Sequence, residues 1–130
     1  MDLMLDTCGL LSLAGLAEKR LAPKTLERIK VAENLYISAC SLFEIAIKHK
    51  KGNLNLGVFH DAKDLWDKVI ATYDLTQLPI PAEIFFHAVS LPDHHADPFD
   101  RIIIAQASRL DLPLVTFDPC FAQYGIKLLA

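Results

Sequence analysis

The segment PDHHADPFDRIIIAQA, residues 92–107, concentrates groups that could do chemistry. Two histidines and three aspartates fall within eight residues, immediately before a solid apolar run. The pattern predicts a helix opened by Pro98, with Asp97 as its N-cap and Asp100 in its first turn, where a carboxylate meets the positive end of the helix dipole. Capping accounts for both aspartates, but it does not account for the histidines beside them.

Two further aspartates directly follow apolar segments that are typical of buried strands. Asp6 follows LML, and Asp118 follows LVTF. In an α/β fold the binding crevice lies outside the carboxyl ends of the parallel strands, so both carboxylates are candidates for that crevice. An N-cap or an Asx turn is the alternative role for each, because aspartate is favoured at both positions.

Glu44 lies inside the apolar helical segment SLFEIAIK. A surface ion pair with Lys48, four residues later, is its alternative role. Four carboxylates at the ends of elements could instead converge on one crevice, where two of them about 4 Å apart would repel by about 4 kcal/mol. Such a cluster needs protons or a cation, and oxygen ligands select a hard ion such as Mg²⁺ or Mn²⁺, completed by substrate phosphates. The predicted chemistry is therefore that of phosphodiesters.

Other kinds of site find little support in the sequence. Adjacent histidines point apart, and neither H-E-x-x-H nor H-x-x-x-H occurs, which disfavours zinc. We interpret His95 as a group that orients a metal ligand or faces a phosphate, with an exposed loop histidine as the alternative. Glycine-rich phosphate loops and the G-x-S-x-G elbow of serine hydrolases are both absent.

The elements that must position these residues alternate along the chain. Apolar and β-branched runs predict short strands at 3–5, 35–38, 76–80, 112–117 and 126–130. Helical spacing and capping residues predict helices at 7–16, 22–34, 41–52, 59–73, 81–91 and 97–110. Alternating strands and helices predict an α/β fold, here one three-layer αβα domain over residues 1–130 with a mainly parallel sheet covered on both faces.

Composition sets the remaining bounds. At 130 residues and a net charge of −3 the chain suits one globular domain, with eight Lys/Arg and six Asp/Glu in the first 60 residues against five and ten in the rest. A basic surface and an acidic site can therefore coexist. Cys8, Cys40 and Cys120 lack metal-site spacing and are expected to be reduced, mostly buried thiols. No apolar run reaches about 18 residues, and we expect a cytoplasmic protein with no membrane contact.

Four blocks of this sequence resemble those of the PIN-domain family, and within it the VapC-type ribonuclease toxins of bacterial toxin-antitoxin pairs. The blocks are MLDTCGLLSL, SACSLFEIAIKHKKGNL, HHADPFDRIIIAQA and LVTFDPCF, and they occur in the family's order across nearly the whole chain. The middle two are the specific ones. The resemblance implies a PIN-like fold and metal-assisted hydrolysis of RNA with Mg²⁺, which Mn²⁺ could replace.

The resemblance also assigns roles to residues of this chain. The metal-binding and catalytic acids would be Asp6, Glu44, Asp100 and Asp118, with Asp97 as an accessory metal ligand. The accessory group also includes Thr7, Arg101 and Thr116; Arg101 could contact a phosphate or a neighbouring acid, and Thr116 would help to fix the end of the last long strand. Cys8 stands where many PIN domains have asparagine, which removes a side-chain amide near the metal.

Partners follow from the same resemblance. VapC-like proteins typically act as homodimers, each inhibited by a cognate antitoxin that lays an apolar segment into a groove. Lys48, Lys50 and Lys51 could follow the RNA backbone, although a solvated helix end explains each lysine equally well. Two alternatives stay open: a receiver-like signalling module, and a catalytically inactive PIN-like domain that binds nucleic acid or protein.

Overall fold

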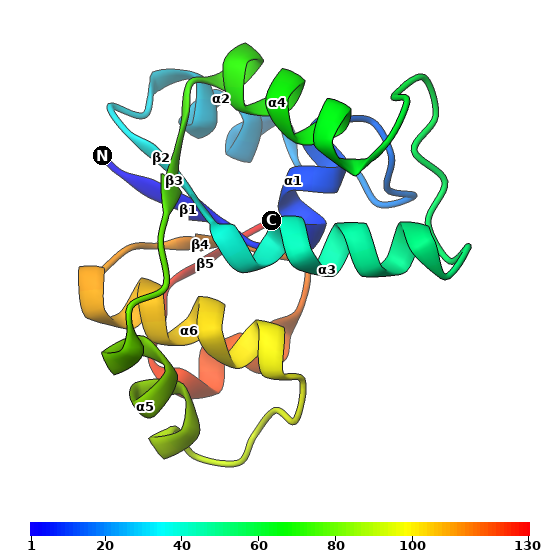
Figure 1. Cartoon of the computed structure of the whole chain (residues 1–130). Coiled ribbons are helices and arrows are strands. Elements are labelled where there is room, and N and C mark those ends of the chain that lie inside the picture. Colours follow the sequence, from blue (N-terminus) through cyan, green and yellow to red (C-terminus); the bar gives the residue numbers. More distant parts are fainter.

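The computed structural model describes all residues 1–130 and contains a five-stranded sheet (Figure 1). Its strands are β1 (Leu3–Leu5), β2 (Leu35–Ser38), β3 (Leu75–Leu78), β4 (Leu114–Val115) and β5 (Leu128–Leu129). The strand order is β3-β2-β1-β4-β5, and every pair is parallel. The α/β prediction with a mainly parallel sheet is confirmed, and the carboxyl ends of all five strands therefore meet at one edge.

Helices cover both faces of this sheet. They are α1 (Thr7–Leu13), α2 (Pro23–Val31), α3 (Ala39–Lys50), α4 (Ala62–Tyr73), α5 (Ala82–Ser90), α6 (Pro98–Leu110) and the 3₁₀ helix η1 (Pro119–Tyr124). Figure 1 shows α1, α2 and α4 on one side of the sheet and α5 and α6 on the other. None of these helices has the length and apolar character that a bilayer crossing requires.

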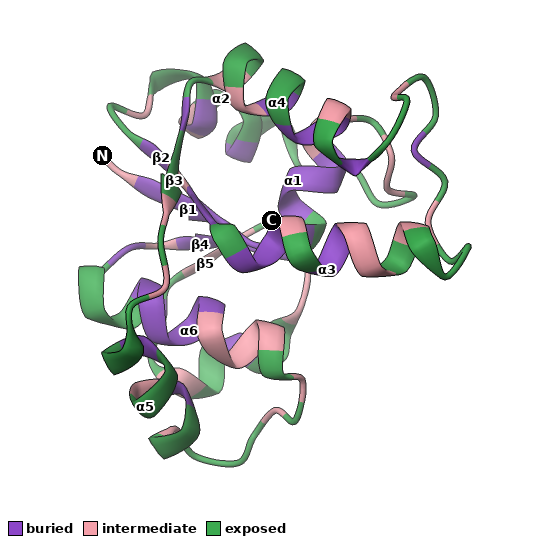
Figure 2. Ribbon diagram, viewed as in Figure 1, coloured by how far each residue is buried: buried purple, intermediate pink, exposed green.

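The alternating side chains of β1 separate two hydrophobic clusters. Leu3 and Leu5 belong to the cluster formed with α1, α2 and α4, whereas Met4 belongs to the one formed with α6 and η1. All three are fully buried, as the purple central strands in Figure 2 show. A buried centre on both faces fixes the register, because a one-residue slip would exchange the two sets of side chains.

The boundaries of several elements differ by a few residues from those that the sequence predicts. Helix α2 ends at Val31 rather than at Asn34, and the strand predicted at 112–117 is reduced to the two residues of β4. Strand β4 ends because its neighbour turns away: the Asp6 N–H donates to Val115 O at 3.1 Å, and the chain then enters α1. Helix η1 was not predicted, since PCFAQY has no helical apolar period.

Gly9 brings the first turn of α1 against the end of β4. A methyl group added there would lie 2.8 Å from Val115 O and 3.2 Å from Asp6 Oδ1. The first distance is shorter than a van der Waals contact, and the neighbouring atom is main chain and cannot move aside cheaply.

We expect Gly9→Ala to lower the free energy of unfolding by about 1–3 kcal/mol, the cost of overpacking. Helix propensity alone predicts the opposite, a gain of up to about 1 kcal/mol, so the sign decides between the two effects. Urea titration of Gly9→Ala beside Ser108→Ala, at an exposed position of α6, measures it. A stabilised Gly9→Ala variant would contradict the close approach.

Candidate metal centre

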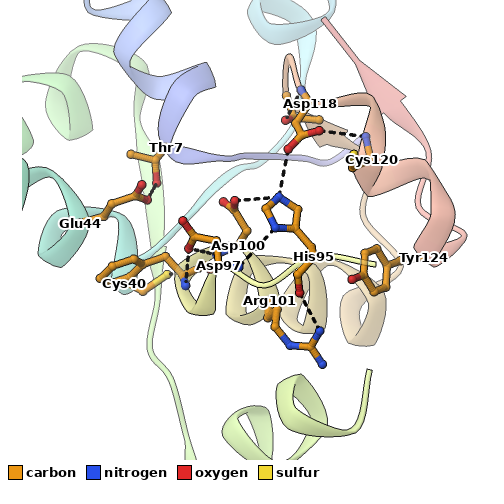
Figure 3. Close-up of polar contacts among 12 residues, drawn as sticks. Thr7, Cys40, Glu44, His95, Asp97, Asp100, Arg101, Asp118, Cys120 and Tyr124 are labelled. Atoms are coloured by element: carbon orange, nitrogen blue, oxygen red, sulfur yellow. Dashed lines mark hydrogen bonds and ion pairs between the residues drawn. The ribbon is translucent and has the colours of Figure 1, made fainter. Parts of the chain in front are cut away.

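Four elements bring carboxylates to the carboxyl edge of the sheet. Asp6 follows β1, Asp118 lies three residues after the end of β4, Glu44 lies on α3 directly after β2, and Asp97 and Asp100 lie at the start of α6. In Figure 3 the carboxylate of Asp100 lies between those of Glu44 and Asp118. The structure thus brings together all five acids that the sequence nominates.

Three of these acids are also N-caps. The Oδ1 atoms of Asp6, Asp97 and Asp118 each accept a hydrogen bond from a main-chain N–H group in the following turn. The donors are the N–H groups of Gly9, Phe99 and Cys120, at 2.6, 2.8 and 2.9 Å. Capping uses one oxygen and leaves Oδ2 of each carboxylate for another partner, so the capping role and the candidate ligand role are compatible. The cap also fixes the direction of the second oxygen.

Glu44 is held from both sides, although its side chain lies in an apolar helical segment. The Thr7 hydroxyl donates to Oε1 at 2.7 Å, and Lys48 Nζ donates to Oε2 at 2.8 Å. The ion pair between Glu44 and Lys48, which the alternative interpretation predicted, is present. Glu44 is only 6% exposed, however, so the pair does not lie wholly at the surface. Burial opposes the charged amine of Lys48, but the hydrogen bond and charge of Glu44 outweigh it and raise the Lys48 pKa. Ser41, which sequence reasoning missed, lies 2.9 Å from the Thr7 hydroxyl.

Thr116 links the acids at the ends of β1 and β4. Its side chain is buried, and Oγ1 accepts the Asp118 N–H at 3.1 Å. A hydrogen bond from the same side chain stabilises the charged form of Asp6. The predicted role of Thr116, fixing the end of this strand, thus has a concrete geometry, although its part in any activity stays a prediction.

His95 joins Asp100 and Asp118. Its Nε2 lies 3.1 Å from Asp100 Oδ2 and 3.0 Å from Asp118 Oδ2 (Figure 3). Its Nδ1 accepts the Asp97 N–H at 3.4 Å, which places the proton of a neutral ring on Nε2, facing the two carboxylates. In this tautomer the ring orients the two acids, in line with the first of the two roles that the sequence suggested. His95, Asp100 and Asp118 offer ligand atoms within 4.8 Å of one another, so they could hold a metal ion, with His95 as a ligand only once Nε2 has lost its proton.

Arg101 positions the loop that carries His95. Its guanidinium donates to the carbonyl oxygens of Leu91 at 2.7 Å and His95 at 2.9 Å, and its Nε donates to Ala88 O at 3.1 Å. The acid beside it is Asp93, at 3.7 Å. One of the two predicted contacts of Arg101, that with a neighbouring acid, corresponds to the Asp93 pair. The other, with a phosphate, stays a prediction, because these donors already bind main-chain carbonyl groups.

Crowding perturbs the proton affinities of two acids. Burial, reinforced by the charges of Asp97 and Glu44, raises the pKa of Asp100 to about 7. Burial likewise raises the pKa of Asp6 to about 6, against the opposing hydrogen bonds from Thr116 and Gly9. Neighbouring carboxylates repel one another, and a divalent cation bound between them would offset that repulsion. Carboxylate oxygens are hard ligands, which suit Mg²⁺ or Mn²⁺. The residues present therefore fit such an ion.

Asp118 behaves differently because it lies closer to solvent. Burial is the largest single influence and disfavours its charge, but hydrogen bonds from the Cys120 N–H and His95 together outweigh it and lower the pKa of Asp118. Asp118 therefore keeps its charge to a lower pH than Asp6 and Asp100 do.

The cysteines correct one expectation. Cys40 is buried, but Cys8 and Cys120 are exposed, so the thiols are not mostly buried. Partial burial and the nearby Asp6 raise the pKa of Cys8 to about 11, which keeps this thiol protonated at neutral pH.

The fold and this cluster define a class: an αβα protein with carboxylates gathered at the carboxyl edge of a parallel sheet. The sequence profile of the PIN domain matches residues 3–127, and the chain belongs to that family. A sequence search among curated proteins finds no match.

Similar solved structures share the fold. FitAcB from Neisseria gonorrhoeae is 17% identical with a TM-score of 0.62, covering 100% of this chain and 97% of that one. VapBC2 from Rickettsia felis, bound to a DNA fragment from its promoter, is 19% identical with a TM-score of 0.65, covering 98% and 97%. A toxin-antitoxin complex from Klebsiella pneumoniae is 22% identical with a TM-score of 0.61, covering 89% and 86%.

We expect the metal-free protein to lose stability as the pH rises. The folded pKa values of Asp6 and Asp100 lie above the ordinary 3.8, so the folded state binds more protons than the unfolded state between about pH 4 and 7. The stabilising protonation is complete below that window and is lost as the pH rises through 6 and 7. Thermal unfolding in EDTA should therefore give a higher Tm at pH 5.5 than at pH 8.

Asp100→Asn is the matched control for this pH dependence. This variant lacks the carboxyl group whose pKa is raised to about 7, so its Tm should vary less with pH. At pH 8 its Tm should equal or exceed that of the wild type. A variant clearly destabilised at pH 8 would indicate that the carboxylate of Asp100 serves the helix start more than it crowds the cluster.

Proposed function

We propose that this protein is a divalent-metal-dependent endoribonuclease and the toxin of a toxin-antitoxin pair. The observation that carries the proposal is the placement of Asp6, Glu44, Asp100 and Asp118 at one edge of the sheet, where burial and neighbouring charges raise the pKa of Asp6 and of Asp100. Membership of the PIN family supports the same activity, because PIN-domain nucleases are typically metal-dependent.

The four acids, with Asp97 as the accessory ligand, would hold Mg²⁺ or Mn²⁺. When bound, the ion supplies a polarised water and stabilises charge on the scissile phosphate. The chain's own contribution is to keep these side chains in place. Thr7 and Lys48 fix Glu44, and His95 fixes two acids, so little reorganisation is needed when substrate arrives.

The end of α3 could supply the electrostatic contact with RNA. Lys50 and Lys51 are exposed and form no ion pair, whereas Lys48 is already committed to Glu44. The two free lysines are therefore the better candidates for phosphate contacts.

Similar structures support the proposed partner. The Klebsiella pneumoniae neighbour is one chain of a toxin-antitoxin complex, and the match covers 86% of that chain. Exposed apolar side chains on α5, namely Phe85, Phe86 and Val89, are compatible with the homodimer or the antitoxin contact that we propose.

The receiver-like alternative is disfavoured by topology. Receiver domains such as CheY have the strand order 2-1-3-4-5, whereas this sheet has the order β3-β2-β1-β4-β5. An inactive PIN-like binding domain keeps the same fold, so only an activity measurement separates it from the nuclease.

The direct test is RNA cleavage by the purified chain, freed of any antitoxin, in Mn²⁺, Mg²⁺ or EDTA. We expect metal-dependent cuts at defined sites in a panel of structured and unstructured RNAs. Asp6→Asn should lose at least about a hundredfold in rate, since removing one electrostatic stabiliser costs that much. Asparagine caps helices as well as aspartate does, so the fold should survive.

Asp61→Asn is the matched control, because Asp61 caps α4 in the same way and its side chain lies at the exposed surface. It should cleave like the wild type. If the wild type bound metal but cut no RNA in the panel, the inactive binding domain would replace the nuclease.

A second test concerns the lysines. Lys50→Glu/Lys51→Glu should weaken RNA binding and flatten its dependence on salt, by about 0.7 in the log–log slope for each phosphate that the variant no longer neutralises. Lys63→Glu/Lys68→Glu on α4 makes the same change of charge on another helix and should leave the slope unchanged. Equal slopes for both double variants would remove the assignment to α3.

A further inference from the structure

A cavity of about 590 Å³ opens beside the acids, and its lining combines acidic and apolar residues. Asp6 and Asp118 belong to the lining, so this cavity adjoins the candidate metal centre. Ala17, Phe117 and Pro119 supply apolar lining, and Phe117 packs against the larger hydrophobic cluster while remaining partly exposed. Its volume lies within the range of about 300–1,000 Å³ typical of small-ligand sites.

The charges of the lining restrict what this cavity can hold. Asp6, Asp118 and Glu18 outnumber its one cation, Lys19, so a phosphate would be repelled from the cavity wherever no metal ion offsets these charges. Lys19 Nζ lies 6.0 Å from the centroid of the Phe117 ring. An incoming cation would meet the charge of Lys19 whether that side chain stays over the ring or moves to the rim of the cavity. A flat, uncharged group suits the aromatic ring best.

We propose that this cavity, the Phe117 pocket, binds one unpaired base of the RNA, from the nucleotide adjoining the scissile phosphate. The inference rests on the proposed ribonuclease function and adds to it a site that holds one base of the substrate. Bases stack on aromatic side chains whatever their identity. A base stacked on Phe117 has its own phosphates within reach of the adjacent acids and their ion.

Lys19 completes this arrangement at the mouth of the pocket. Its side chain is exposed and forms no ion pair, so it can leave the ring and meet the phosphate on the outer side of the stacked nucleotide. In this arrangement Phe117 stacks on the uncharged base, and Lys19 pairs with a phosphate of the RNA backbone.

The test begins with a short single-stranded RNA that the wild type cuts at one mapped position in Mn²⁺. Two further RNAs each carry an abasic residue on one side of the cut. We expect one of them to raise KM, and the Kd measured by fluorescence anisotropy in EDTA, by about fivefold or more, the lower end for base–aromatic stacking. Phe117→Leu should raise both values for the parent RNA and bind the parent and that abasic RNA alike, whereas Phe117→Tyr should behave as the wild type.

Val31→Ala is the control, because Val31 is a 74% exposed apolar residue at the end of α2. It should bind every RNA as the wild type does. If both abasic RNAs were bound and cut like their parent, or if Phe117→Leu changed neither KM nor Kd, the base pocket would be wrong while the ribonuclease stood. If no RNA were cut, the proposed function would fail first. An arginine-rich peptide that binds and is weakened by Phe117→Leu, with abasic RNAs unaffected, would instead assign the pocket to a protein partner.

Discussion

Asp6 and Asp100 are held among other carboxylates in surroundings that hydrate their charges poorly, and pKa values of about 6 and 7 reflect the cost. Two bare carboxylates about 4 Å apart repel by about 4 kcal/mol at an effective dielectric near 20. A flexible chain would move them apart. Here the parallel sheet prevents this, because it delivers the ends of β1, β2 and β4 to the same edge.

Three of the acids are held in place by the same hydrogen bonds that cap helices. One oxygen of Asp6, Asp97 and Asp118 closes the start of a helix or 3₁₀ turn, and the other oxygen is left to the cluster. Each helix start therefore stabilises the fold and at the same time directs a carboxylate oxygen toward the cluster. His95 and Thr116 then connect neighbouring acids, so that the cluster is a network rather than a set of separate side chains.

Much of this arrangement can be predicted from the sequence, because it depends on local patterns. The LYIS strand has the predicted bounds, and Asp97 and Pro98 mark the start of α6 as capping rules require. The convergence of the acids follows from the parallel sheet. Contacts between distant segments could not be predicted in this way: Thr7 meets Glu44 across 37 positions, and His95 meets Asp118 across 23. The short β4 is also a tertiary effect, since it depends on where its neighbour turns.

The most direct measurement is the binding of Mn²⁺ to the metal-free protein at pH 6.5, by calorimetry in two buffers of different ionisation enthalpy. If the crowded acids form the ion site, Mn²⁺ binds and displaces about one proton, mostly from Asp100, and the release disappears at pH 8.5. Asp100→Asn should bind more weakly and release less. Two results would contradict the view that this cluster is a cation site. One is the absence of Mn²⁺ binding, and the other is binding that releases the same number of protons at both pH values and in the variant.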